Sequence, residues 1–129
     1  MGDFTTIGAQ FIQFFYQTFD TDRKSLVNLF RPNSMLTFET EQFLGTENII
    51  NKFLGIGAER LSHAVMTADY QPCPDGTGTN RGIIVLVTGT LTMDQEMPMK
   101  YSEVFNLQPA PDAEGSYYVF NELFKLNLG

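Results

Sequence analysis

The period of the hydrophobic residues changes near residue 60, and this change constrains the fold more than any other feature of the chain. Before it, apolar side chains recur at the spacing of a helix; after it, they alternate along the chain. A segment rich in β-branched residues covers 83–94, and alternating patterns follow over 99–108 and 117–128. Because a period of two is typical of strands, we predict helices first and four long strands after residue 60.

Three helices are expected in the N-terminal part. The first covers residues 5–20, where the side-chain oxygen of Thr5 or Thr6 is suited to an N-cap. The acidic run 20–22 is expected to break this helix and to cap a second, shorter one. The third helix is expected to follow with Thr46 as its N-cap. Their apolar stripes favour packing on the sheet.

Two short strands are predicted between the second and third helices, at residues 35–38 and around Phe43. With the long strands they favour an α+β fold, a single domain over residues 1–129 in which a curved antiparallel sheet packs on the three helices. A cone-like sheet of this kind encloses an apolar cavity. The residues that we expect to line it are Phe38, Ile56, Leu61, Met99 and Phe124.

The last strands carry apolar residues on both faces, and the helices can cover only one of them. In the final strand one face holds Phe120, Phe124 and Leu126, and the other holds Tyr117, Val119 and Leu123. A sheet that is apolar on both faces needs a second cover. With no helix predicted after the third, we expect that cover to be a second copy of the chain, paired by a two-fold axis.

Charge and cysteine content narrow the classes of function. The chain has 15 acidic and 8 basic residues, a net charge of −7, which argues against binding to a phosphate backbone. The scattered acids serve either solubility or the attraction of a basic partner. A single cysteine, Cys73, cannot form an internal disulfide, and no apolar run reaches the roughly 18 residues of a membrane span. We therefore expect a cytosolic or nuclear protein without membrane insertion.

Few residues suggest catalysis or metal binding. His63 is the only histidine, no spacing of ligands indicates a metal, and no glycine-rich loop is followed by a phosphate-binding lysine. Glu103 and Glu122 alternate with core positions, so each could face the cavity or the solvent. A surface or interface carboxylate is the favoured interpretation for both. We expect no cofactor and no metal.

Acidic residues beside an aromatic one suggest a docking site. Glu39 and Glu41 flank the turn after Phe38, while Asp94 and Glu96 lie on a separate turn. If the two turns meet, they place an acidic ring at the mouth of the cavity. A partner could then insert an aromatic side chain while its basic residues pair with the ring.

Nearly the whole chain resembles the nuclear transport factor 2 family. The segments that carry the resemblance are Met1–Asp3, Phe11–Gln13, Leu36–Glu39, Gln42–Gly45, Asp69–Asp75 and Asn121–Leu126, together with His63. The resemblance implies a cone-shaped homodimer without catalytic activity. It also implies a carrier that brings the GDP-bound form of the small GTPase Ran into the nucleus and binds the Phe-x-Phe-Gly repeats of nuclear pore proteins.

The resemblance also implies roles for individual residues. Phe4 stands where a Trp of the family helps to bind pore repeats, and Leu86 and Leu123 match positions in the dimer interface. Phe38 likewise replaces a Trp beside the cavity. The residues expected to bind Ran are Phe38, Glu39, Asp94, Glu96, Met99 and Phe124.

Two other functions stay open at this point. The chain could be another binding module of the same fold, such as a partner subunit of an RNA-export receptor. It could also be a cavity enzyme, an isomerase or dehydratase, with Glu103, Glu122 or His63 as its base. For the leading hypothesis, the carrier, we expect a location in the cytoplasm and nucleus with enrichment at nuclear pores.

Overall fold

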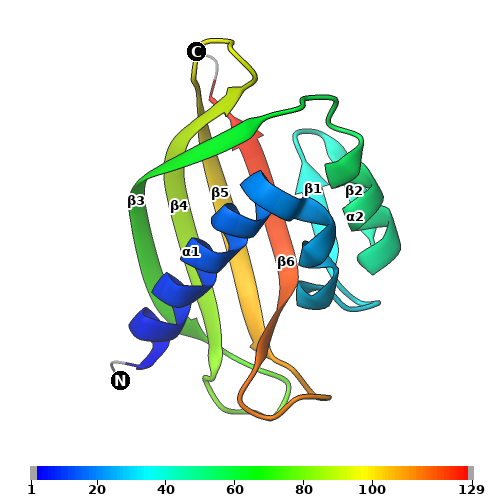
Figure 1. Ribbon diagram of the computed structural model, residues 1–129. Coiled ribbons are helices and arrows are strands. Elements are labelled where there is room, and N and C mark those ends of the chain that lie inside the picture. The colour runs from blue at the N-terminus through cyan, green and yellow to red at the C-terminus, as the bar shows by residue number, and fades with distance from the viewer. Residues whose placement is uncertain (1–2, 128–129) are drawn as a thin grey trace.

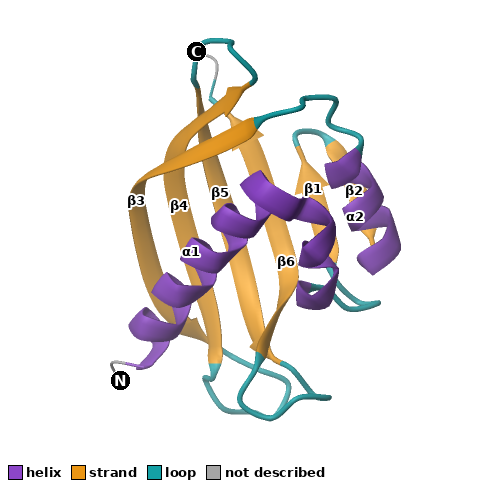
Figure 2. Cartoon of the chain, in the orientation of Figure 1, coloured by secondary structure: helices purple, strands orange, loops and turns teal. Residues whose placement is uncertain are grey.

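The computed structural model describes residues 3–127 and has the expected order, helices first and long strands afterwards (Figures 1 and 2). The helical elements are α1 (Asp3–Asp22), the 3₁₀ helix η1 (Arg23–Leu29) and α2 (Thr46–Leu54). The strands are β1 (Met35–Phe38), β2 (Glu41–Leu44), β3 (Leu61–Cys73), β4 (Gly82–Met93), β5 (Met99–Pro109) and β6 (Tyr117–Leu126).

The strands form one six-stranded sheet in the order β2-β1-β6-β5-β4-β3. Neighbouring strands are antiparallel except β1 and β6, which run parallel with Phe38 opposite Phe124. The prediction of a wholly antiparallel sheet is therefore wrong at this pair. Antiparallel pairing is imposed by a short hairpin, whereas β1 and β6 are separated by most of the chain and are free to pair either way.

α1 crosses the curved sheet diagonally and supplies much of the core (Figure 1). Its buried face includes Phe11, Phe15, Tyr16 and Phe19, and the Phe15 ring lies 4.9 Å from that of Phe105 on β5, edge to face. Such aromatic pairs stabilise a core beyond the area that they bury. The other face of α1 is polar, and no helix among residues 3–127 is long and apolar enough to cross a membrane.

The ends of the helices differ from the prediction. α1 already begins at Asp3 and continues through Asp22, so the run 20–22 does not break it. The Asp20 carboxylate instead accepts a hydrogen bond from the backbone N–H of His63, at 2.8 Å. The expected second helix is the 3₁₀ helix η1, and α2 is preceded by Gly45 at φ 89°, with no side-chain cap from Thr46.

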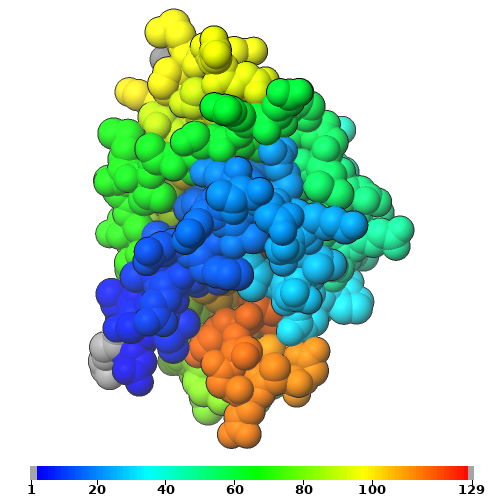
Figure 3. Space-filling view, viewed as in Figure 1, coloured from blue at the N-terminus to red at the C-terminus, as the bar shows by residue number. Residues whose placement is uncertain are grey.

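Two turns project from opposite ends of the molecule. The β4–β5 turn, residues 94–98, lies at the top of Figure 3, and the β5–β6 turn, residues 110–116, lies at the bottom. α1 covers the face between them. Charge substitutions on the two turns can therefore be compared at opposite ends of the molecule.

Candidate functional site

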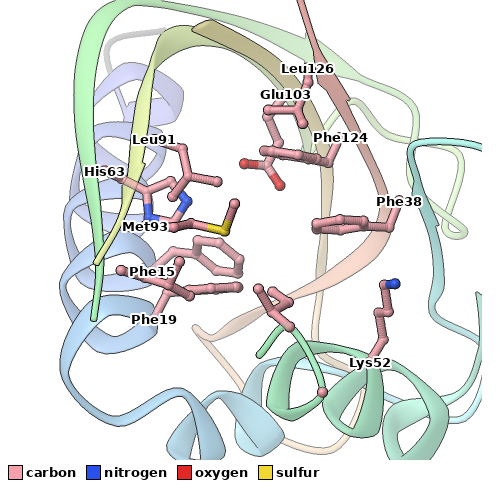
Figure 4. A pocket seen from close by; sticks show the side chains of 13 residues that line it. Phe15, Phe19, Phe38, Lys52, His63, Leu91, Met93, Glu103, Phe124 and Leu126 are labelled. Carbon is pink, nitrogen blue, oxygen red and sulfur yellow. The ribbon is translucent and has the colours of Figure 1, made fainter. Parts of the chain in front are cut away.

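A cavity of about 230 Å³ lies between the helices and the inner face of the sheet (Figure 4). Its walls are mostly apolar and come from every part of the chain. The lining residues are Phe15, Phe19, Phe38, Lys52, Gly55, Ile56, Leu61, His63, Leu91, Met93, Glu103, Phe124 and Leu126. Four of the five predicted lining residues are present.

The exception is Met99, which does not line the cavity. It starts β5 two residues before Tyr101, where pairing with β6 begins, so no β6 side chain encloses it. Met93 and Leu126, which were not among the predicted lining residues, contribute to the wall instead. Both lie at strand ends, where alternation alone does not show which residues reach a cavity.

Phe38 and Phe124 form one side of the cavity because β1 and β6 pair in parallel. Their rings stack at 4.6 Å with an angle of 15°. The Lys52 Nζ lies 5.0 Å from the centre of the Phe38 ring and forms an ion pair of 3.0 Å with Glu41. The positive charge in the wall is therefore already balanced by a rim carboxylate.

A carboxyl and an imidazole also line the cavity. Glu103, directly opposite Phe124 in the sheet, is 3% exposed, and its Oε1 accepts a hydrogen bond of 2.8 Å from the Tyr16 hydroxyl. The His63 Nδ1 lies 2.7 Å from Asp20 Oδ1. The interpretation of Glu103 and Glu122 as surface carboxylates is wrong, since Glu122 is only 2% exposed.

The two buried glutamates lie in a similar environment. Burial raises the pKa of Glu103, and burial together with the charge of Glu103 raises the pKa of Glu122 well above its usual 4.5. Both carboxyls are therefore easier to protonate than exposed ones, and Glu103 is the one that lines the cavity.

Two of the predicted rim acids occupy equivalent places in the backbone. Glu39 directly follows Phe38, and Asp94 directly follows Met93, so each comes after a residue of the cavity wall. They are also the two non-glycine residues within 3–127 that have positive φ, at 59° and 54°. Each strand thus turns sharply directly after a residue of the cavity wall.

The rim acids differ in how firmly they are held. Glu39 Oε1 accepts a hydrogen bond of 3.1 Å from the backbone N–H of Leu126, and its Oε2 lies 3.6 Å from the Lys125 Nζ. Asp94 Oδ1 accepts one of 2.9 Å from the N–H of Arg60. Within the described part of the chain, neither Asp94 nor the exposed Glu96 forms an ion pair.

The outer face of the sheet carries an apolar row. Leu86, Val104 and Leu123 are direct neighbours across β4, β5 and β6, and Leu86 and Leu123 are 43% and 51% exposed. Ile84, two residues before Leu86 and on the same face, is also exposed. The two residues predicted for the dimer interface therefore lie in one continuous row.

A shallow groove lies beside Phe4 at the start of α1. Its other lining residues are Asp3, Ile7, Pro72, Asn80, Arg81 and Tyr117. The loop after β3 is organised around one carboxylate. Asp75 accepts hydrogen bonds from the backbone N–H groups of Thr77, Thr79 and Arg81. Bonds from these residues, Thr77 first, hold the pKa of Asp75 below its usual range.

The chain offers no site for a metal ion in the part that the structure describes. No group of three or more His, Cys, Asp or Glu side chains within residues 3–127 is placed to hold one. The single thiol, Cys73, is buried, and burial raises its pKa. The candidate site is therefore an apolar cavity with acidic residues near it.

Comparison with known proteins is consistent with this geometry. The model of the nuclear transport factor 2 (NTF2) domain matches residues 7–126. The chain is 47% identical to nuclear transport factor 2 of Davidiella tassiana over 127 residues, 98% of this chain and 96% of that protein. The structure of nuclear transport factor 2 from Cryptosporidium parvum superposes with a TM-score of 0.87 at 45% identity, covering 96% of this chain and 94% of that one.

A more distant likeness concerns the fold alone. The Mtr2–Mex67 M domain complex of C. albicans matches with a TM-score of 0.78 at 13% identity, covering 95% of this chain and 94% of that one. At this identity, the likeness carries no argument about partners.

Proposed function

This chain belongs to the nuclear transport factor 2 domain family, and from that membership we propose that it carries the GDP-bound form of Ran into the nucleus. Its curated relatives are transport factors, and we treat the chain as a carrier and not as an enzyme. The observation that carries the proposal is the apolar cavity flanked by acids, in a chain that matches these relatives over nearly its whole length. In this role the protein moves between cytoplasm and nucleus and gathers at nuclear pores.

The size of the cavity favours one inserted side chain as its occupant. A volume of about 230 Å³ is below the roughly 300 to 1,000 Å³ of pockets for drug-sized ligands. It is larger than the roughly 150 Å³ cavity that binds benzene in an engineered protein. An aromatic residue of Ran that enters between Phe38, Phe124 and Leu91 would bury its ring, with a gain of about 1.5–3 kcal/mol.

The rim acids then pair with basic residues of Ran. Asp94 and Glu96 form no ion pair within the described residues, whereas Glu39 is held in place by Leu126 and Lys125. Charges at the edge of an interface mainly set the association rate and the orientation, and the net charge of −7 adds to the attraction. In this proposal the cavity provides most of the affinity, and the rim acids fix the orientation in which Ran binds.

Asp94 offers the sharpest test, because Glu39 also supports the backbone at Leu126. Asp94→Asn retains an oxygen for the N–H of Arg60 and removes only the charge, while Asp94→Lys reverses it. We expect binding of Ran–GDP, measured by calorimetry, to weaken by about tenfold for each 1.4 kcal/mol of lost pairing, with Lys worse than Asn. Ran that is loaded with a GTP analogue should not bind at all.

Glu114→Lys is the matched control. It changes the net charge as much as Asp94→Lys does, but it lies on the turn at the opposite end of the molecule. We expect it to retain binding of Ran–GDP. Equal losses in the two Lys variants would show that the effect comes from net charge, and unchanged binding in Asp94→Lys would remove Asp94 from the proposed rim.

The proposal includes a second binding surface, for Phe-x-Phe-Gly repeats, at the groove beside Phe4. The groove is separate from the cavity and shares no lining residue with it. Phe4→Ala should therefore weaken binding of a repeat peptide and leave Ran–GDP binding unchanged. Loss of both activities together would argue against separate surfaces.

A further inference from the structure

The wall of the cavity contains a carboxyl group that an apolar ring does not use. Glu103 belongs to the cavity wall and is almost wholly buried, and in Figure 4 its carboxylate points into the open space near Leu91 and Phe124. Its Oε1 accepts a hydrogen bond of 2.8 Å from the Tyr16 hydroxyl. A carboxylate has about four acceptor positions, so capacity for another donor remains.

The titratable groups at this wall are Glu103 and His63, with Glu122 and Asp20 close behind them; His63 already contacts Asp20. Burial raises the pKa of Glu103, and a cation beside the carboxyl would favour its ionised form. Lys52 contributes to the wall near Phe38 but is paired with Glu41 at 3.0 Å.

Two tyrosine hydroxyls lie near Glu103. Tyr16 donates to it, and the buried hydroxyl of Tyr101 has no hydrogen-bond partner within the described residues, so it could also contact a polar ligand. The other neighbours in the wall, Leu91 and Phe124, are apolar. A ligand that brings both an apolar body and a positive donor would fit this arrangement, because charge-assisted hydrogen bonds are the strong ones.

We propose that the cavity is a binding site for small aromatic ammonium compounds, with the ammonium on Glu103 and the ring between Phe38, Phe124 and Leu91. The volume of about 230 Å³ suits one ring with a short amine arm. The apolar walls exclude water from the ion pair, which strengthens it, and the carboxylate is already desolvated in the free protein.

This inference stands on the cavity and does not require Ran. A bound amine and an inserted side chain of a partner would occupy the same space, so each would exclude the other. Direct titration of the amine in the absence of Ran keeps the two proposals separate. Either one can fail while the other holds.

Benzylamine and benzyl alcohol are suitable probes, because they have nearly the same shape and differ in charge. By calorimetry at neutral pH we expect the protein to bind benzylamine at least tenfold more tightly than benzyl alcohol. In a ¹H–¹⁵N NMR titration the shifted amides should include those of His63, Leu91 and Phe124. Equal affinities for the two probes, or shifts confined to other surfaces, would overturn the proposal without any variant.

Two variants test the role of the carboxylate. Glu103→Gln removes the charge and should bring the ratio of affinities close to one. Glu122→Gln removes the second buried carboxyl and leaves Glu103 in the cavity wall, so the preference for benzylamine should persist. A preference that survives in folded Glu103→Gln protein, or that disappears equally in both variants, would contradict the assignment.

Discussion

At the scale of single residues, the buried glutamate pair makes stability depend on pH. Because burial raises both pKa values, the folded chain keeps a proton that the unfolded chain releases above about pH 4.5. The unfolded state then binds fewer protons, so stability falls as the pH rises from that value toward the folded pKa values. Glu122→Gln needs no bound proton, so it should reduce this fall and raise the free energy of unfolding at pH 7 relative to the unaltered protein.

Urea unfolding at pH 5 and pH 8, at one protein concentration, measures the effect. Glu114→Gln is the control, because Glu114 is exposed on a turn and should leave the pH dependence unchanged. The same slope in Glu122→Gln and in the unaltered protein would show that the pair does not hold the proton.

The alternation of residues 99–108 did place Glu103 among inward positions. A lone carboxylate there is usually at a surface, however, and sequence alone cannot show that Glu122 lies beside it.

At the scale of elements, the loop after β3 depends on Asp75. Asp75→Ala removes the acceptor for three backbone N–H groups, so amide hydrogen exchange at Thr77, Thr79 and Arg81 should approach that of an open chain. Because Arg81 also lines the groove beside Phe4, repeat peptides should bind several-fold more weakly. Unchanged exchange at the three amides would show that the carboxylate does not organise the loop.

The elements themselves were mostly predictable from sequence. The alternation of apolar and polar residues identified the long strands, and the prediction of a strand at 35–38 matches β1. The parallel pairing of β1 with β6 was not predictable, because it depends on contacts between distant segments. The same holds for the cavity wall: Phe38 and Phe124 were identified, whereas Met93 replaces Met99 because the enclosed space ends where β6 stops pairing with β5.

At the scale of the whole molecule, the exposed row on the sheet predicts a dimer. Leu86, Val104 and Leu123 form an apolar strip on the face that no helix covers. Leu123→Glu would bury a carboxylate without a partner in such an interface, which costs several kcal/mol, so the variant should be monomeric. Light scattering gives the mass, with Gln13→Glu on the exposed face of α1 as the control for one added negative charge.

An unchanged mass for Leu123→Glu would place the interface elsewhere or show that the chain is a monomer. Preference for a different subunit in a pull-down would instead support the role of a heterodimer partner. The sequence predicts a second cover from apolar residues on both faces of the last strand, but it misplaces Val119. The pairing of β5 with β6 shifts register between Asn106 and Leu107, which turns Val119 into the same core as Phe124. The sequence alone does not say what covers the exposed strip, since it would suit a copy of the chain or another protein.

The left-handed backbone at Glu39 and Asp94 has a consequence for anyone who redesigns this protein. Such a conformation costs roughly 1–3 kcal/mol in a residue other than glycine, so a search for heat resistance would favour Gly or Asn at both positions. Those substitutions would remove the carboxylates that flank the cavity. A version of this protein optimised only for thermal tolerance would therefore tend to be more stable and to lose the binding of its proposed partner.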